Sequence, residues 1–255
     1  MIICLRPQPD CGLDVAELTR QAVQAVALPM LQVVYLSAPQ VLFSSVGQHS
    51  SYQGIVITSK QASRYLAEHA KISPEMRRLP VWSVGAGSAD ILQEVGFEIA
   101  YTGNSNAADL AEQICQQGAS GPLLWLSGRN VYFDMAARLN GQGITVNRQV
   151  VYHTEGLLTP YQAVQDHLLS AQPAAVIIFS SRTLAQFELW LDEYVPAAKA
   201  SQLTVLAASS GLAQQARAAG FMALQADSPD RQAVLHLSVD WFQQKFSKNR
   251  SQKLT

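Results

Sequence analysis

The sequence has few charged residues, few cysteines and no long apolar run. Charged residues make up 15% of the 255 positions, and 18 Lys and Arg against 19 Asp and Glu leave a formal net charge of −1. Because no basic stripe exists outside the last residues, the composition does not favour nucleic acid or an anionic membrane surface as a partner. No apolar run approaches the ~20 residues that cross a bilayer, so no membrane-spanning role is expected.

Cysteine is equally scarce. Cys4, Cys11 and Cys115 form neither an even disulfide set nor a CxxC pair, which favours the reducing cytoplasm. The opening residues, MIICLRPQPD, do not resemble a signal peptide, so export is not expected. The sequence shows no cluster of His, Cys and carboxylates at metal-ligand spacing and no phosphate loop, and it therefore predicts neither a metal nor a cofactor.

What is present is a repeated unit. Residues 55–66 read IVITSKQASRYL, a β-branched run that ends on Thr58 and Ser59 and continues into a helical pattern. Such a strand delivers hydroxyls to a helix N-terminus, where unpaired N–H groups suit an anionic oxygen; ordinary N-capping is the alternative. Residues 176–189, VIIFSSRTLAQFEL, repeat the pattern with Ser180 and Ser181.

The spacing of the repeat indicates an internal duplication. Ser59 and Ser181 are 181 − 59 = 122 residues apart, and Gly96 and Gly220 are 220 − 96 = 124 apart. The strand-turn-helix units follow the order A, B, C, A, B, C. We therefore predict an α/β fold of two similar doubly wound domains, each with a mainly parallel sheet and helices on both faces.

Individual elements follow from hydrophobic periodicity and from Gly and Pro breaks. The sequence predicts strands at residues 2–5, 31–36, 55–57, 80–84, 123–126, 146–152 and 176–179, and helices at 15–27, from 60 toward 71, 89–95, 107–117 and from 129 to about 140. The hydroxyls and small-residue turns fall after the strands, at the carboxyl ends where open α/β sheets bind ligands.

The chain resembles the uroporphyrinogen-III synthase family over nearly its whole length. The motifs that carry the resemblance are, in order, Leu5-Arg6-Pro7, Ile57-Thr58-Ser59, Val84-Gly85-x-x-Ser88-Ala89 with Gly96, Gly128-Arg129, Val151-Tyr152 and Phe179-Ser180-Ser181. Gln61 stands where the family often has Asn, and Ser209 and Leu212 stand where the second turn often has Gly and Thr.

The resemblance implies a discontinuous domain organisation. Residues 1–36 with 157–255 would form one domain and 40–148 the other, with 31–39 and 149–156 as a two-stranded extended linker. The implied reaction closes hydroxymethylbilane to uroporphyrinogen III in haem and sirohaem biosynthesis. It proceeds by loss of water and inversion of the last pyrrole through a spiro intermediate, without a cofactor.

The resemblance also implies site residues. Tyr152 matches the family tyrosine and is the expected proton donor; structural packing of an amphipathic aromatic is the alternative. Arg6 and Arg129 could pair with substrate carboxylates, or with backbone carbonyls or surface carboxylates instead. The other expected substrate-binding residues are Thr58, Ser59, Gly85, Ser88, Ser127, Gly128, Ser180 and Ser181.

The expected partners are few. The substrate is the small molecule hydroxymethylbilane, with transient hand-over from the preceding pathway enzyme, and the chain is expected to be a cytoplasmic monomer. A rival interpretation is a two-lobed binding protein that closes on an anionic ligand without changing it, because duplicated α/β lobes suit it equally well.

Overall fold

The structure is a computed structural model that describes residues 1–37, 52–70, 72–103, 106–170, 172–200 and 202–251. These residues divide into two compact units, Met1–Gln32 with Glu155–Thr255 (unit 1) and Val33–Thr154 (unit 2). Two strands cross from one unit to the other, β3 (Leu31–Tyr35) and β8 (Val146–Gly156), and they are hydrogen-bonded neighbours. Residues 38 and 39 of the expected linker lie outside the described part of the chain.

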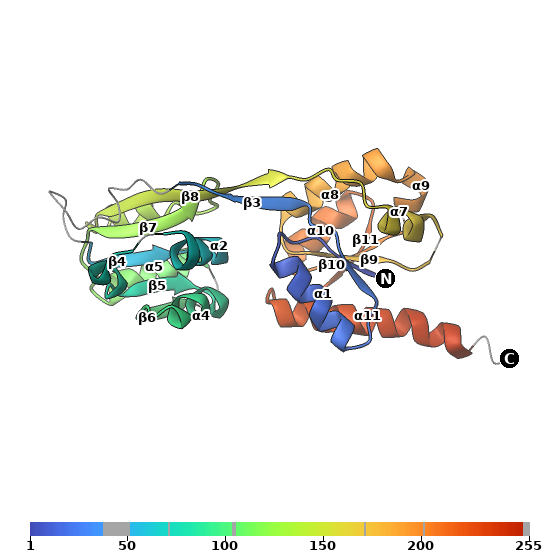
Figure 1. The fold of residues 1–255 in the computed structure, drawn as a ribbon, viewed down its shortest axis with the longest axis horizontal. Helices are drawn as coiled ribbons and strands as arrows, with labels where there is room; N and C mark the ends of the chain where they lie inside the picture. The colour runs from blue at the N-terminus through green and yellow to red at the C-terminus, as the bar shows by residue number, and fades with distance from the viewer. Residues whose placement is uncertain (38–51, 71, 104–105, 171, 201, 252–255) are drawn as a thin grey trace. The chain divides into compact units, whose positions relative to one another are not determined.

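Unit 2 is built on a sheet of order β3-β8-β7-β4-β5-β6, in which each pairing from β8 to β6 is parallel (Figure 1). Its other strands are β4 (Gly54–Ile57), β5 (Val81–Val84), β6 (Ile99–Gly103) and β7 (Leu123–Gly128). Its helices are α2 (Lys60–Arg64), the π-helix η2 (Tyr65–His69), α3 (Pro74–Arg77), α4 (Ala86–Glu94), α5 (Ala107–Gln116) and α6 (Met135–Asn140).

Both faces of this sheet are covered. Ile55 and Ile57 of β4 pack with Leu66 and Leu92 on the face of α2, η2 and α4. Val56, between them, packs instead with the cluster of Trp125 and of α5 and α6 on the other face. This alternation is what a strand buried on both sides requires, and it explains the continuous apolar run in the sequence.

Unit 1 repeats the arrangement with a sheet of order β11-β10-β9-β1-β2, parallel throughout. Its strands are β1 (Ile2–Cys4), β2 (Ala25–Ala27), β9 (Ala175–Ile178), β10 (Thr204–Ala207) and β11 (Met222–Gln225). Its helices are α1 (Asp10–Arg20), α7 (Gln162–Leu169), α8 (Ser181–Tyr194), α9 (Ala197–Ala200), α10 (Ser210–Ala218) and α11 (Arg231–Ser251).

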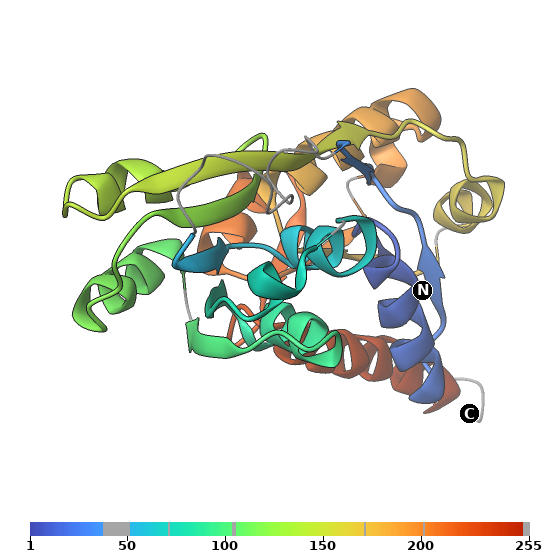
Figure 2. The same ribbon diagram turned by 60° about the vertical axis from the view of Figure 1, so that its left-hand side comes forward.

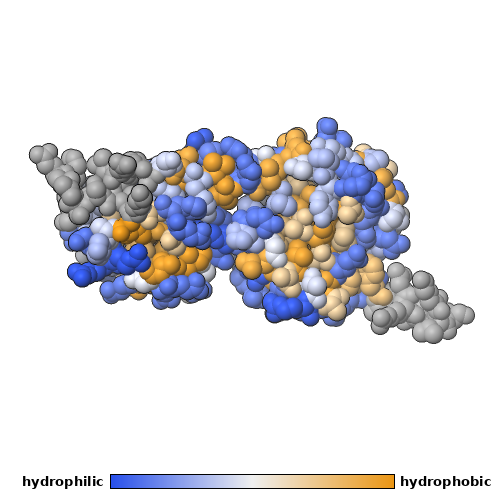
Figure 3. All heavy atoms as spheres, viewed as in Figure 1, coloured by the Kyte–Doolittle hydropathy of each residue, from blue (hydrophilic) through white to orange (hydrophobic). Residues whose placement is uncertain are grey.

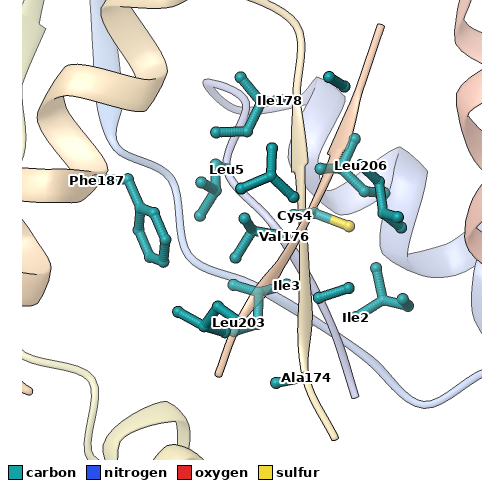
Figure 4. Packing of buried hydrophobic residues seen from close by; sticks show 14 of the residues in the cluster. Ile2, Ile3, Cys4, Leu5, Ala174, Val176, Ile178, Phe187, Leu203 and Leu206 are labelled. Carbon is teal, nitrogen blue, oxygen red and sulfur yellow. The ribbon is translucent and has the colours of Figure 1, made fainter. Parts of the chain in front are cut away.

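The core of unit 1 surrounds its central strands. Ile2, Ile3 and Val176 are fully buried, and Phe187 of α8 packs from one side (Figure 4). Helices α1 and α11 lie together below the sheet in Figure 1, whereas α8 and α10 lie above it. At about 1.5–3 kcal/mol for each large apolar side chain buried, this core dominates the stability of the unit.

The predicted duplication is confirmed. Strands β9, β10 and β11 match β4, β5 and β6 in order, and β1 and β2 match β7 and β8, so the sheets share one topology. The pairing of Ser59 with Ser181 was wrong by one residue, since the helix caps are Ser59 and Ser180, 180 − 59 = 121 residues apart. Ser181 is the first residue of α8 and is exposed.

The predicted helix at 15–27 was also wrong. Helix α1 ends at Arg20, and Ala25–Ala27 is strand β2, which pairs with β1. Ala22 has a positive φ of 58°, and the N–H of Val23 bonds back to the carbonyl of Leu18, which terminates the helix. An alanine in this conformation gives no sequence signal, because glycine or asparagine usually occupies it.

No helix among the described residues is long and apolar enough to cross a membrane. On the face drawn in Figure 3, hydrophilic and hydrophobic residues are interspersed over each unit.

Candidate active site

The candidate site in unit 2 centres on a hydrogen bond between Tyr152 and Ser59. The phenol of Tyr152 donates to Ser59 Oγ at 3.0 Å. Tyr152 lies on β8 and Ser59 follows β4, with β7 between them in the sheet. The tyrosine therefore reaches across the end of β7, at the carboxyl edge of the sheet.

Gly128, at the end of β7, makes this crossing possible. A Cβ at this position would lie 2.7 Å from Cζ and 2.8 Å from the hydroxyl oxygen of Tyr152. Any side chain on residue 128 would occupy the place of the tyrosine ring. The N–H of Arg129 also donates to the carbonyl of Tyr152 at 2.9 Å, which fixes the two backbones together.

A register shift turns Tyr152 to the required face. Strands β7 and β8 run side by side (Figures 1 and 2), with Ser127 opposite Val150 but Gly128 opposite Tyr152, so Val151 is the extra residue. In an unbroken strand Tyr152 would share the face of Val146, six residues earlier. Instead Tyr152 packs against the cluster of Ile57, and Val146 belongs to the cluster of the opposite face.

Burial raises the pKa of the Tyr152 phenol above 10.0, whereas its hydrogen bond with Ser59 acts to lower it. The phenol is thus protonated at neutral pH. Ser59 Oγ also accepts from the N–H of Ala62 as the cap of α2. With both lone pairs of Ser59 in use, the Tyr152 and Ser59 hydroxyls together retain one O–H for a further acceptor.

Thr58 and Ser127 are held by neighbours that the sequence analysis did not single out. Trp125 Nε1 donates to Thr58 Oγ1 at 3.2 Å, and Arg148 Nε donates to Ser127 Oγ at 2.8 Å. Trp125 is fully buried and Ser127 nearly so. No motif pointed to Arg148, because its importance depends on the register of β8 against β7.

The turn from Gly85 to Ser88 begins α4. Gly85 has a φ of 78° and caps the helix without a side-chain hydrogen bond. Ser88 is buried, and its carbonyl accepts from Ser63 Oγ at 2.9 Å, which joins α4 to α2. A Cβ at Gly87 would lie 2.6 Å from Lys60 Nζ, so this ammonium group, also missed in the sequence, lies at the start of α4.

The expected residues of unit 1 are held within that unit. Arg6 forms ion pairs with Asp10 at 3.1 Å and with Asp14 at 3.2 Å, and its guanidinium lies 4.8 Å from the ring centroid of Phe179. Asp14 is fully buried and also pairs with Arg231 of α11. Arg6 thus has buried carboxylate partners in its own chain, whereas the alternative considered from the sequence was a surface carboxylate or backbone carbonyls.

Ser180 caps α8 by accepting from the N–H of Thr183 at 3.2 Å. Ser209 caps α10 in the same way, because its Oγ accepts from the N–H of Leu212. The corresponding helix of unit 2, α4, is capped by Gly85, which has no side chain. Gln61, the other departure from the family pattern, accepts from the Tyr35 hydroxyl at 2.9 Å.

Among the residues that the structure describes, no group of three or more His, Cys, Asp and Glu side chains is placed to hold a metal ion. The polar groups near the carboxyl edge of unit 2 are instead hydroxyls, a phenol, backbone amides and the ammonium group of Lys60, with Arg129 directly after the end of β7. Such a set can bind anionic oxygens and move a single proton.

The duplicated, doubly wound fold and this hydroxyl-rich edge define a two-unit α/β protein suited to a small anionic ligand. The sequence model of the family described as uroporphyrinogen-III synthase HemD matches residues 14–236. The chain therefore belongs to the uroporphyrinogen-III synthase family, and it is a cyclising lyase of tetrapyrrole biosynthesis. The resemblance noted in the sequence is confirmed, and the binding-protein alternative is not favoured.

Solved structures agree on the fold. The uroporphyrinogen-III synthetase of Helicobacter pylori matches with a TM-score of 0.62 at 17% identity, over 94% of this chain and 98% of that one. A mutant uroporphyrinogen III synthase from Thermus thermophilus matches with a TM-score of 0.53 at 13% identity, over 96% and 99% of the two chains. At these identities the likeness is one of fold.

Proposed function

We propose that this chain closes hydroxymethylbilane to uroporphyrinogen III with Tyr152 and Ser59 as the hydroxyl pair that protonates the departing hydroxyl. The observation that carries the proposal is the 3.0 Å hydrogen bond between the two side chains, at the carboxyl edge of a sheet in a chain of this family. Open α/β sheets bind their ligands at this edge.

The chemistry requires one proton at one place. Loss of water from the substrate needs a donor to the leaving hydroxyl, and ring closure later releases a proton from a pyrrole carbon. The pair supplies the first proton and recovers the second, so no net proton is consumed. The Ser59 O–H is the one left to reach the leaving oxygen, and the phenol of Tyr152, a weak acid with a raised pKa, passes its own proton to Ser59 Oγ as the carbon–oxygen bond breaks.

Substrate carboxylates bind around the pair in this proposal. Thr58 accepts from Trp125 and so keeps its own O–H for a carboxylate oxygen. Arg129 follows Gly128 directly, and its exposed side chain supplies a cation beside Tyr152. The start of α4 at Gly85, with Lys60 against it, offers backbone N–H groups and a second cation. We place Ser88, Ser127 and Ser180 further from the substrate, because their contacts serve the fold.

We further propose that the chain acts as a monomer in the cytoplasm and receives its substrate from the preceding enzyme of the pathway. The free thiols of Cys4 and Cys11, both buried, support a reducing compartment.

The test is Tyr152→Phe, assayed with freshly prepared hydroxymethylbilane and separation of the type I and type III products. The variant should lower kcat by about 100-fold with little change in KM, since one general acid is lost and binding groups remain. Tyr132→Phe is the matched control, because Tyr132 is 96% exposed, and its kcat should equal that of the wild type. A Tyr152→Phe enzyme with full kcat would remove Tyr152 from the chemistry.

A further inference from the structure

Arg148 binds three oxygens at the end of β7. Its Nε donates to Ser127 Oγ at 2.8 Å, and its Nη2 donates to the carbonyls of Gly128 at 2.9 Å and Arg129 at 3.0 Å. A planar guanidinium can hold several acceptors in one fixed geometry, which an ammonium group cannot reproduce. The three consecutive residues are thus tied to one side chain of β8.

The Tyr152 ring and the Arg148 guanidinium lie on opposite faces of this strand end. The Arg148 guanidinium lies 5.0 Å from the ring centroid of Trp125, in the cluster of α5 and α6. Tyr152 packs against the other cluster, with its ring over Gly128. The end of β7 is therefore fixed from one face by Arg148 and forms the support for the tyrosine on the other.

Two sets of contacts lead from Arg148 to the hydroxyl pair. One passes through Gly128 and Arg129, whose backbone contacts the Tyr152 ring and carbonyl. The other passes through Trp125, whose indole N–H bonds to Thr58, the residue before Ser59. Both members of the pair thus depend on groups that Arg148 contacts directly.

We infer that Arg148 is a positioning residue that holds the end of β7 so that Tyr152 meets Ser59 in the reactive geometry. The inference rests on the function proposed for Tyr152, and it assigns Arg148 no contact with the substrate. Loss of the Arg148 guanidinium should let the backbone at Gly128 move, and the Tyr152 ring that packs on it should move as well. The hydroxyls and cations that bind substrate carboxylates should stay in place.

The experiment compares Arg148→Met, Arg148→Lys and the control Arg138→Met. Methionine at position 148 keeps an unbranched side chain over Trp125 but removes every hydrogen-bond donor, whereas lysine keeps the positive charge. Arg138→Met makes the same substitution at an exposed residue of α6 and is the control. Arg148→Met should lower kcat by about 10-fold with KM changed by less than about 2-fold, because positioning and not binding is lost. Arg148→Lys should have the same kcat and KM as Arg148→Met. Arg138→Met should have the kcat and KM of the wild type.

A second readout observes Tyr152 without catalysis. In protein labelled with ¹³C at the tyrosine ε carbons, the signal missing from Tyr152→Phe identifies Tyr152. This signal should shift or broaden in Arg148→Met and Arg148→Lys, and stay in place in Arg138→Met. The measurement uses folded protein at neutral pH and needs no substrate, so it also reports on variants with little activity.

The outcomes separate the inference from the proposed function. An unchanged Tyr152 signal in Arg148→Met, or full kcat in Arg148→Lys, overturns the positioning role, even where Tyr152→Phe is inactive. Full kcat in Tyr152→Phe overturns the catalytic role of Tyr152, whereas a shifted Tyr152 signal in Arg148→Met still establishes that Arg148 positions it.

Discussion

The sharpest prediction concerns Gly128→Ala. The added Cβ would lie 2.7 Å from Cζ, 2.8 Å from the hydroxyl oxygen and 2.9 Å from Cε2 of Tyr152, whereas ordinary contact begins at 3.4 Å. The nearest ring atom must retreat by about 3.4 − 2.7 = 0.7 Å. Because the ring is rigid, its hydroxyl moves with it, and the 3.0 Å bond to Ser59 is lost or distorted.

The size of the effect follows from this displacement. A misplacement of about 1 Å costs about 100-fold in rate, so a shift of about 0.7 Å should lower kcat by about 10- to 100-fold. Overpacking costs about 1–3 kcal/mol in a tight core. At about 2–4 °C for each kcal/mol in a chain of this size, the melting temperature should fall by no more than about 12 °C, and the enzyme should stay folded at 25 °C.

Gly211→Ala is the matched control. Gly211 lies in α10, and among the described residues no heavy atom outside its own stretch of helix lies within 4 Å of the place that a Cβ would take. Alanine also favours the helix, so the kcat of this variant should equal that of the wild type. Steady-state kinetics and thermal melting of both variants test the reasoning. A folded Gly128→Ala enzyme with wild-type kcat would refute the claim that the Tyr152 position limits the reaction.

Two further predictions concern the hydroxyls and the thiols. Replacing both Thr58 and Ser59 with Ala should raise KM, at about 1.5–3 kcal/mol for the lost hydrogen bond of Thr58 to a charged oxygen, and should lower kcat because Ser59 belongs to the hydroxyl pair. Ser73→Ala, which removes the cap of α3, should cost about 1 kcal/mol of stability and leave both constants unchanged; early melting with normal KM and kcat in the double variant would leave Ser59 only its role as a cap. Burial raises the pKa of the Cys11 thiol from 9.0 to about 12 and that of Cys4 further still. As the pH rises, the unfolded chain therefore loses these thiol protons before the folded protein does, and the unfolding free energy should fall above about pH 9 by about 1.4 kcal/mol per pH unit for each thiol. Denaturant titrations at pH 8, 9 and 10 should show that the unfolding free energy falls less steeply with pH in Cys11→Ala than in the wild type, and equal slopes in the two proteins would contradict the assignment.

The fold was predictable because its signals are local and repeated. The apolar runs at Ile55–Ile57 and Val176–Ile178 are buried strands in the structure, and glycines such as Gly96 and Gly220, both with positive φ, end the helices before them. Repetition of these signals in one order made the duplication visible. Short edge elements were missed, since β2 and β11 have neither length nor strong alternation.

The site was predictable only in its residue types. The sequence placed Thr58 and Ser59 after a strand, but it could not reveal that Trp125 bonds to Thr58 or that Tyr152 bonds to Ser59. The second contact depends on the extra residue Val151, and a bulge is a property of two strands together. Arg148 was missed for the same reason, because a lone arginine in a polar strand has no motif.

The order of strands in unit 1 has a consequence for synthesis. Strand β1 pairs with β9, and Ile2 lies opposite Ala175, 175 − 2 = 173 residues later. At about 5–20 residues per second, the ribosome needs about 9 to 35 s to deliver this partner. Unit 2 is complete in the chain before β9 is made, so it can fold first, while the apolar segment Ile2–Leu5 waits with one open edge. Translation speed and chaperone supply should therefore affect the yield of this protein, because they decide how long this edge stays open.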